Sequence, residues 1–371
     1  MPPLTWDRVR GWRLARHHLD RRVPARRLTD VVTDVCGIHA QVQSAAELQI
    51  WARVGGVTPE DVREALWEER RLVRTWAMRG TLHVLTAEDL PLYAAALGTI
   101  DRWKGVWLKY VGLTQAQFEA LIEAIQQSLG ARPITREQLA EKVAERVGPA
   151  AQERMRSGWG ELLKPAAFRG SLISGPPRGQ NVTFVRPDRW LGRWPRPDGD
   201  ASVREVLRRY LHTFGPATHD DFARWWGVQP APARRILRSM PEDEVAEVEV
   251  GDTTASALAA DVPLLGKASP RGIVRLLPMF DHYVVGFRPR EEIVEKRFAP
   301  RVFRKAAWIS QTVLVDGRIA GIWAHEKAGR RIEVTVEPFA RLAAATKKVI
   351  ADEADRLGRF LGAPATVAYS A

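Results

Sequence analysis

The sequence predicts a mixed α+β fold in which three winged-helix (helix-turn-helix plus β-wing) modules follow one another and a strand-rich region ends the chain. Two observations predict this organisation. A pattern of helices, a helix opened by a threonine cap, a further helix and two short strands occurs three times. The last third of the chain changes to segments in which apolar and polar residues alternate, as in half-buried strands. The predicted modules cover residues 1–112, 113–200 and 201–268, and the C-terminal region covers 269–371.

The first copy contains three predicted helices and a hairpin. The helices cover residues 5–19, 28–38 and 59–70. Thr29 and Thr58 are candidate caps of the second and third helix, because a threonine hydroxyl can accept a bond from a free N–H of the first turn. The segments LVRTWAM and TLHVLT lie on either side of Arg79-Gly80 and predict two strands joined by a tight turn.

The second copy repeats this order. Its predicted helices cover residues 114–128, 138–147 and 151–168, and Thr135 is the cap of the second one. The segments SLIS and NVTFVRP predict strands, and the GPPRGQ between them predicts a loop of several residues. The stretch 186–200, rich in Arg, Pro and Gly, predicts a connector to the next module.

The third copy and the C-terminal region complete the chain. The third copy predicts helices over residues 203–215, 222–227 (capped by Thr218) and 232–240, and strands that begin with EVAEVEV. The C-terminal segments IVRLLPMF, YVVGF, TVLVDGRIAGIWAH and RIEVTVEPF predict strands. Asp316-Gly317 predicts a hairpin turn, and Ala328-Gly329 is a second candidate turn. An amphipathic helix is predicted over residues 340–361.

The charge balance indicates a polyanionic partner. The chain of 371 residues carries a net charge of +12, from 56 Lys+Arg against 44 Asp+Glu. Arginine supplies 46 of the cations, and its planar fork pairs with phosphates and guanine edges. A GC-rich genome also favours arginine codons, so this alternative to DNA binding stays open.

Composition excludes several classes of protein. With 45% apolar and 27% charged residues the chain is not disordered. It contains no apolar stretch of membrane-spanning length, and the N-terminus lacks the apolar core of a secretory signal, so we expect a cytoplasmic protein without a membrane partner. The single cysteine, Cys36, excludes an internal disulfide, a cysteine-rich zinc site and a cysteine-ligated iron–sulfur cluster.

The sequence lacks the motifs of the common cofactor-dependent and hydrolytic enzymes. It contains no phosphate-binding loop ending in GK[ST], no dinucleotide-binding glycine pattern, no GxSxG and no HExxH. The eight histidines show no metal-ligand spacing. We therefore expect neither a metal nor a cofactor.

Two other segments carry candidate chemistry. In IHAQVQSA, Gln41 and Gln43 would share a face if the backbone is extended or irregular, but would diverge by about 200° on an α-helix. Taken alone, such a pair is more often two polar loop residues than a catalytic site. In LLPMFDHYVVGFRPR, Asp281 and His282 could form an acid/base pair, or the aspartate could be a helix cap or a salt-bridge partner of the arginines that follow.

Five segments together resemble the AlkZ/YcaQ family of bacterial DNA glycosylases: IHAQVQSA, TWAMRGTLHVLTAEDL, FGPATHDDFARWWG, LLPMFDHYVVGFRPR and VLVDGRIAGIW. The resemblance extends over nearly the whole chain. It implies tandem winged helices in a C-shaped body whose basic channel holds duplex DNA, and a C-terminal hairpin near the minor groove. Its most specific part, Gln41-Val42-Gln43, matches the Gln-x-Gln branch, which resembles the self-resistance enzymes of producers of DNA-alkylating antibiotics such as azinomycin.

The resemblance implies that Gln41 and Gln43 are the catalytic residues. A purine alkylated at N7 or N3 is cationic and leaves as a neutral base, so no general acid is needed. A glutamine carbonyl can orient a water toward C1′ but is too weak a base to drive the loss of an unmodified base. The expected partner is duplex DNA with alkylated purines, with interstrand crosslinks as a candidate second substrate.

The remaining expectations concern DNA contacts and strand cleavage. The candidate DNA-contacting residues are Arg74, Arg79, His83, His325, Lys327, Arg330 and Arg331. No lysine precedes Lys104, so we expect a monofunctional enzyme that forms no Schiff base, with the amine of a processed Pro2 as the local alternative. We expect a monomer. The rival functions are a non-enzymatic winged-helix regulator and a protein-binding adaptor.

Overall fold

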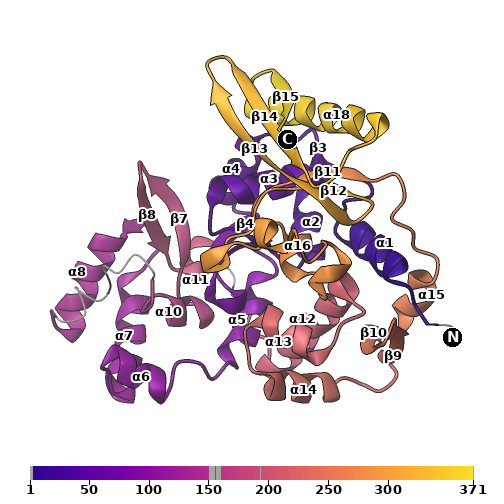
Figure 1. The fold of residues 1–371 in the computed structure, drawn as a ribbon. Coiled ribbons are helices and arrows are strands. Elements are labelled where there is room, and N and C mark those ends of the chain that lie inside the picture. Colours follow the sequence, from indigo (N-terminus) through magenta and orange to yellow (C-terminus); the bar gives the residue numbers. More distant parts are fainter. Residues whose placement is uncertain (1–2, 150–154, 156–159, 193, 371) are drawn as a thin grey trace. The chain divides into compact units, whose positions relative to one another are not determined.

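The computed structural model describes residues 3–149, 155, 160–192 and 194–370. Contacts divide the chain into two compact units. The first unit consists of Met1–Val62, Leu207–Trp225 and Gln229–Ala371, and the second consists of Arg63–Val206 and Trp226–Val228. Figure 1 follows the elements along the chain.

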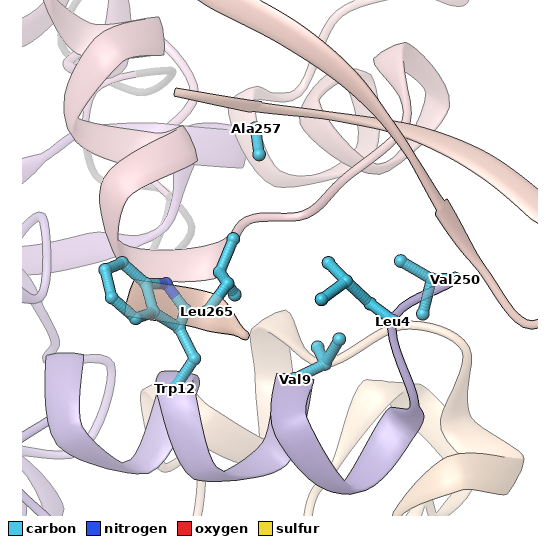
Figure 2. Close-up of a cluster of buried hydrophobic side chains, with 6 residues drawn as sticks. All are labelled: Leu4, Val9, Trp12, Val250, Ala257 and Leu265. Atoms are coloured by element: carbon cyan, nitrogen blue, oxygen red, sulfur yellow. The ribbon is translucent and has the colours of Figure 1, made fainter. Parts of the chain in front are cut away.

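The first unit begins with helix α1 (Trp6–Arg16), which starts where the sequence predicts. The Thr5 hydroxyl accepts a hydrogen bond from the Arg8 N–H at 3.4 Å and so caps the helix. One face of α1 packs on strands β9 (Val245–Val250) and β10 (Thr253–Leu258) and on the short helix α15 (Val262–Leu265). Figure 2 shows the buried side chains of this contact: Leu4, Val9, Trp12, Val250, Ala257 and Leu265.

The next helix is shorter than predicted. Helix α2 covers Leu28–Asp34 instead of residues 28–38, and Thr29 lies inside it rather than at its cap. The helix ends because Cys36 and Gly37 adopt left-handed conformations, with φ of 59° and 91°. The chain then forms strand β2 (Ile38–His39), a bend, and helix α3 (Gln43–Arg53). On either side of this run, β1 (Val23–Pro24) and β3 (Val54–Gly55) pair in parallel.

A five-stranded sheet fills the C-terminal part of the first unit. Its strands, in spatial order, are β11 (Val274–Leu277), β12 (Thr312–Val315), β13 (Arg318–Ala328), β14 (Arg331–Pro338) and β15 (Ala365–Tyr369). The pairs are antiparallel except β14 with β15. Helix α18 (Ala344–Leu361) packs on β11, β14 and β15, and Figure 1 shows it beside β15. The turn at Asp316-Gly317 is as predicted.

The C-terminal region differs from its prediction in three places. YVVGF is not a strand but most of helix α16 (His282–Gly286), because the Asp281 carboxylate caps its first turn through the Tyr283 N–H at 3.0 Å. Strand β15 was not predicted. The predicted C-terminal helix begins at Ala344, four residues later than expected.

The third predicted copy forms the expected order of elements. These are helices α12 (Gly199–Phe214), α13 (His219–Trp226) and α14 (Pro230–Arg238), followed by the β9–β10 hairpin. The Thr218 hydroxyl accepts from the Asp221 N–H at 3.2 Å, which confirms this cap. The remaining helical elements of the first unit are short. Residues Ala299–Val302 form helix α17, and four 3₁₀ helices cover Ala25–Arg27, Ala259–Asp261, Arg290–Glu292 and Lys305–Ala307.

The second unit contains the remaining elements. In chain order these are α4 (Pro59–Trp67, which begins in the first unit), β4 (Leu72–Trp76), β5 (Leu82–Thr86), α5 (Leu90–Gly98), α6 (Val106–Val111), α7 (Gln115–Ser128), β6 (Ile134–Thr135), α8 (Arg136–Val147), α10 (Lys164–Phe168), β7 (Ile173–Arg178), β8 (Asn181–Val185) and α11 (Pro187–Trp190). The β4–β5 hairpin turns at Met78–Gly80 as predicted. Thr114 and Thr135 both form capping boxes, each with the glutamine three residues later.

Two predictions in this unit need correction. The expected loop GPPRGQ is mostly strand, because β7 continues through Pro176-Pro177 to Arg178 with an irregular register. The connector 186–200 contains helix α11 and the start of α12. The predicted helix 151–168 lies partly outside the described residues, and its described end forms α10.

The observed mixture of helices and strands confirms the α+β class. The winged-helix assignment and the four domain boundaries stay predictions. Among the described residues, no helix combines the length and apolarity that a membrane crossing requires.

Candidate active site and nucleic-acid interface

The Gln41–Gln43 segment lies at the surface of the first unit, between β2 and α3. Val42 is extended, with φ of −113° and ψ of 118°, and α3 begins at Gln43. The chain bends at Gln41 and Val42, so the segment is irregular and neither a strand nor a helix. Gln41 is exposed and Gln43 is half-buried. The extended or irregular alternative is therefore the one observed, and a common direction of the two side chains stays a prediction.

Glu47 fixes the orientation of the Gln43 amide. The Gln43 Nε2 donates to the Glu47 Oε1 at 3.4 Å, and Glu47 is only 6% exposed. Because the amide nitrogen is the donor in this bond, it faces Glu47, and the carbonyl oxygen Oε1 faces away from it. Glu47 was not among the site residues predicted from the sequence. Residues four apart on a helix are neighbours, so its spacing from Gln43 could have indicated the contact.

Gln49 holds the start of the same segment. This side chain is completely buried, and its Nε2 donates to the His39 carbonyl oxygen at 2.9 Å. The bond joins α3 to the residue where β2 ends, two positions before Gln41. Because a polar group buried in this way is costly to leave unpaired, the bond fixes where the bend can lie.

The far end of α3 is held by a buried ion pair. Arg53 donates from its two terminal nitrogens to the two Asp281 oxygens at 2.7 and 2.8 Å, and neither side chain has exposed surface. Asp281 also caps α16 through the Tyr283 N–H. Asp281 is therefore a structural residue, as the cap and salt-bridge alternative predicts, but its partner is Arg53 and not a following arginine. With His282 only 1% exposed, an acid/base role for the pair is not supported.

Four of the predicted DNA-contacting residues lie on the β13–β14 hairpin. His325 and Lys327 are two residues apart on β13 and share one face. Arg331, opposite Ala328, lies on the other face, and Arg330 lies in the turn. Lys327, Arg330 and Arg331 are exposed. The structure thus places three exposed cations near the tip of the hairpin. Lys327 lies on one face, Arg331 on the other and Arg330 in the turn.

His325 differs from the cations at the tip. It is half-buried, its ring stacks on Trp323 with centroids 5.4 Å apart, and its Nδ1 lies 3.4 Å from the Gln311 Nε2. Burial lowers the His325 pKa, because the charged imidazolium loses its hydration. His325 is therefore neutral at pH 7 and supplies no charge to the hairpin.

The second face of the hairpin carries acidic residues as well. Glu326 and Glu333 are directly opposite each other, both exposed, next to the pair that contains Arg331. Two carboxylates on this face repel phosphates. A duplex that receives the hairpin would therefore approach its tip rather than this face.

The other three candidates lie in the second unit, on the β4–β5 hairpin. Arg74 is half-buried on β4, and burial lowers its pKa. Arg79 is half-buried in the turn, with φ of 59°. His83 has no exposed surface, and its Nδ1 lies 2.9 Å from the Thr81 carbonyl oxygen. A fully buried side chain cannot touch DNA, so the prediction for His83 is not supported.

Among the residues that the structure describes, no three histidine, cysteine or acidic side chains are grouped so that they could hold a metal ion.

Comparisons with known proteins identify the family. A profile described as "DNA glycosylase AlkZ-like" matches residues 32–360. The chain belongs to the AlkZ-like family of DNA glycosylases, which are hydrolases that act on N-glycosyl bonds. This membership confirms the family predicted from the five sequence segments. The Gln-x-Gln branch stays a prediction.

Similar proteins support the same assignment along the whole chain. The protein named "Interstrand DNA cross-link repair glycosylase" from Streptomyces sahachiroi is 34% identical over 367 residues, which cover 96% of this chain and 97% of that protein. The solved structure of Streptomyces sahachiroi DNA glycosylase AlkZ has a TM-score of 0.89 and 33% identity, and the match covers 99% of this chain and 100% of that one.

Proposed function

We propose that the protein hydrolyses the N-glycosidic bond of cationic alkylated purines in duplex DNA, with Gln41 and Gln43 positioning the attacking water. One observation carries the proposal. Val42, between the two amides, has extended φ and ψ, and the Gln43 Nε2 donates to Glu47, which leaves the Gln43 carbonyl oxygen on the side of the amide away from that carboxylate. A carbonyl held in this way accepts a hydrogen bond from water and directs its dipole at the carbon under attack.

The chemistry that these groups supply suits a substrate that is already activated. An alkylated purine leaves as a neutral molecule, and the sugar passes through a transition state like an oxocarbenium ion. The Glu47 carboxyl group lies one helical turn after Gln43 and accepts from its amide nitrogen, so it orients the amide rather than contacting the sugar. Positioning contributes several kcal/mol at most in such a site, so unmodified bases stay attached.

The proposal includes monofunctional hydrolysis, which leaves an abasic site. Strand cleavage by elimination needs an amine that forms a Schiff base with C1′. Along the sequence, the first lysine after Gln41 is Lys104, and it belongs to the second unit. Pro2, the alternative amine, lies outside the described residues. Borohydride should therefore trap no covalent protein–DNA adduct, and a trapped adduct would contradict monofunctional hydrolysis.

Interstrand crosslinks are the proposed second substrate. The relative from Streptomyces sahachiroi is named for crosslink repair and aligns with 96% of this chain. Gln41 is exposed, and an exposed site accepts a base tied to the opposite strand more easily than a closed pocket for a flipped base does. We extend the proposal to self-resistance against a DNA-alkylating antibiotic, by a monomer that acts on the nucleoid in the cytoplasm.

The proposed DNA contacts are the predicted cations that are at least partly exposed to solvent. They are the half-buried Arg74 and Arg79 on the β4–β5 hairpin and the exposed Lys327, Arg330 and Arg331 on the β13–β14 hairpin. Each one that neutralises a phosphate raises the salt dependence of binding by about one unit.

The test is release of free 7-methylguanine from a methylated duplex. Gln41→Ala and Gln43→Ala should each slow release on the order of 100-fold with an unchanged melting temperature. Gln115→Ala is the matched control, because Gln115 also begins a helix and donates to a glutamate four residues on, Glu119, at 2.8 Å. Binding without release by the wild-type protein would favour the regulator, and neither binding nor release would favour the adaptor.

A further inference from the structure

A tight loop in the first unit exposes a tryptophan. The Arg304 N–H donates to the Trp308 carbonyl oxygen at 2.8 Å and closes the loop, and the flanking Phe303 and Ile309 form an isolated β-bridge. Trp308 is 48% exposed. It is the largest side chain among the exposed hydrophobic residues of the described chain, so its position calls for an explanation.

The backbone of this loop is strained. Ala306 and Ala307 have φ of 54° and 60°, the left-handed region that glycine enters easily and alanine does not. Two consecutive residues of this kind persist only where the surrounding structure holds them, and such strain is concentrated at functional sites. The effect here is to present the indole ring of Trp308 at the surface.

Aromatic stacking connects Trp308 to the glutamine segment. The Trp308 ring contacts the Phe280 ring, with centroids 5.2 Å apart, and Phe280 stacks on His39 at 4.9 Å. The indole therefore lies at most about 10 Å from the His39 ring. Phe280 and His39 are both buried, and His39 is two residues before Gln41. A short series of packed rings therefore connects the exposed tryptophan to the segment that carries the proposed catalytic amides.

This connection is rigid. Phe280 has a left-handed backbone, with φ of 58°, and the next residue, Asp281, is locked to Arg53 of α3 by the buried ion pair. Helix α3 begins at Gln43. The ring that supports Trp308 is thus fixed to the helix that carries one of the proposed catalytic residues.

Two cations precede the tryptophan in the same loop. Arg304 and Lys305 are exposed, and neither belongs to an ion pair among the residues that the structure describes. An exposed aromatic ring in one loop with exposed cations is a combination that binds nucleic acids, since the ring stacks on bases and the cations meet phosphates. The other exposed residues of the loop, Ala306 and Ala307, add only two methyl groups, which is less apolar surface than the core of a protein interface offers.

We propose that Trp308 is a DNA-contacting wedge that stacks against a base step beside the target nucleotide, while Arg304 and Lys305 bind the adjacent phosphates. Opening the stack at this step exposes C1′ to the water that Gln41 and Gln43 position. The inference rests on the proposed function, because it takes the glutamine segment as the active site. It assigns the neighbouring loop to substrate distortion rather than to the chemistry.

The experiment uses a duplex with 2-aminopurine next to a tetrahydrofuran abasic analogue, because 2-aminopurine fluoresces more strongly when unstacked. The wild-type protein should raise the fluorescence severalfold, and Trp308→Ala should abolish the rise. Trp308→Ala should also lower kcat/KM for 7-methylguanine release about tenfold, whereas Trp308→Phe keeps most of both signals. Tyr369→Ala is the control, an exposed aromatic residue of the same unit beside a lysine, Lys347.

The outcomes separate this proposal from the proposed function. A Trp308→Ala protein that matches the wild type within twofold in both assays overturns the wedge and leaves the glycosylase intact. A Trp308-dependent fluorescence rise without base release supports the wedge and contradicts the glycosylase. Should Trp308→Ala not fold, Arg304→Gln and Lys305→Gln test the same surface. Each should reduce the salt slope of duplex binding by about 0.9, and unchanged slopes overturn the proposal.

Discussion

The buried ion pair between Arg53 and Asp281 offers the sharpest test of the structure. Asp281→Asn preserves the size of the side chain and its ability to cap α16, but it removes the charge. The Arg53 guanidinium would then keep two neutral acceptors in a site without exposed surface, the amide oxygen at position 281 and the Gln49 carbonyl oxygen, to which its Nη1 already donates at 2.9 Å. Breaking a buried ion pair costs about 3–5 kcal/mol, and the neutral hydrogen bond that stays at position 281 returns about 1 kcal/mol. The expected loss of unfolding free energy is about 2–4 kcal/mol.

The assay is thermal unfolding followed by circular dichroism. For a unit of roughly 220 residues each kcal/mol lowers the melting temperature by about 2–4 °C, so Asp281→Asn should melt about 4–16 °C below the wild type. At 20 °C, well below the melting temperature, Asp281→Asn should still release the base, because the bonds from Gln49 to His39 and from Gln43 to Glu47 stay in place.

A double variant separates charge from packing. Arg53→Met combined with Asp281→Asn removes both charges and keeps the helix cap, and should recover much of the lost melting temperature. The reasoning fails if Asp281→Asn melts within 1 °C of the wild type, or if the double variant is no more stable than the single one. In either case the two charges would not be as isolated from solvent as their contacts indicate.

Three further predictions follow from individual side chains. Glu47→Gln keeps an acceptor oxygen but adds an amide donor, so the Gln43 amide is no longer held in one orientation, and single-turnover release should slow about tenfold with KM unchanged; a change in KM alone would contradict this role. His17 is completely buried, and burial together with nearby arginines keeps its pKa well below 6.5, so it is neutral when folded but takes up a proton when unfolded below pH 6.5. Stability should therefore be full above pH 6.5 and fall as the pH drops, by up to about 2 kcal/mol at pH 5 in urea titrations, and His17→Phe should remove this part of the dependence. On the β13–β14 hairpin, Lys327→Gln should reduce the salt slope of duplex binding by about 0.9 at pH 7.5, whereas His325→Gln should leave it unchanged because burial keeps that imidazole neutral; equal effects in anisotropy titrations would contradict the assignment.

The sequence predicted best what depends on neighbours along the chain. The caps at Thr58, Thr135 and Thr218 are contacts over three residues, and all three are observed. The Asp316-Gly317 turn has the same local origin: both residues adopt positive φ, 47° and 78°, which this pair tolerates.

Errors arose where distant contacts decide the structure. The five apolar residues of YVVGF fit a strand or a buried helix equally well, and the cap from Asp281 selects the helix. Strand β15 exists because β14 offers it a parallel partner across helix α18, which no local pattern reveals. In the same way Arg53 and Asp281 are 228 residues apart, so spacing along the chain could not pair them.

The candidate site combines both situations. Gln41 and Gln43 were singled out by their motif, and the extended φ and ψ of Val42 between them are compatible with the common direction that we propose for their side chains. The contacts that hold this segment in place could not be predicted from the motif. Helix α3 begins at Gln43, and the buried Gln49 in its interior donates to the His39 carbonyl oxygen before the bend. Its last residue, Arg53, forms the buried ion pair with Asp281. A neutral amide supplies little chemical driving force, so its effect depends on how exactly it is held. The rate of base release should therefore depend on the rigidity of α3. Substitutions that loosen the helix should reduce kcat more than they weaken DNA binding.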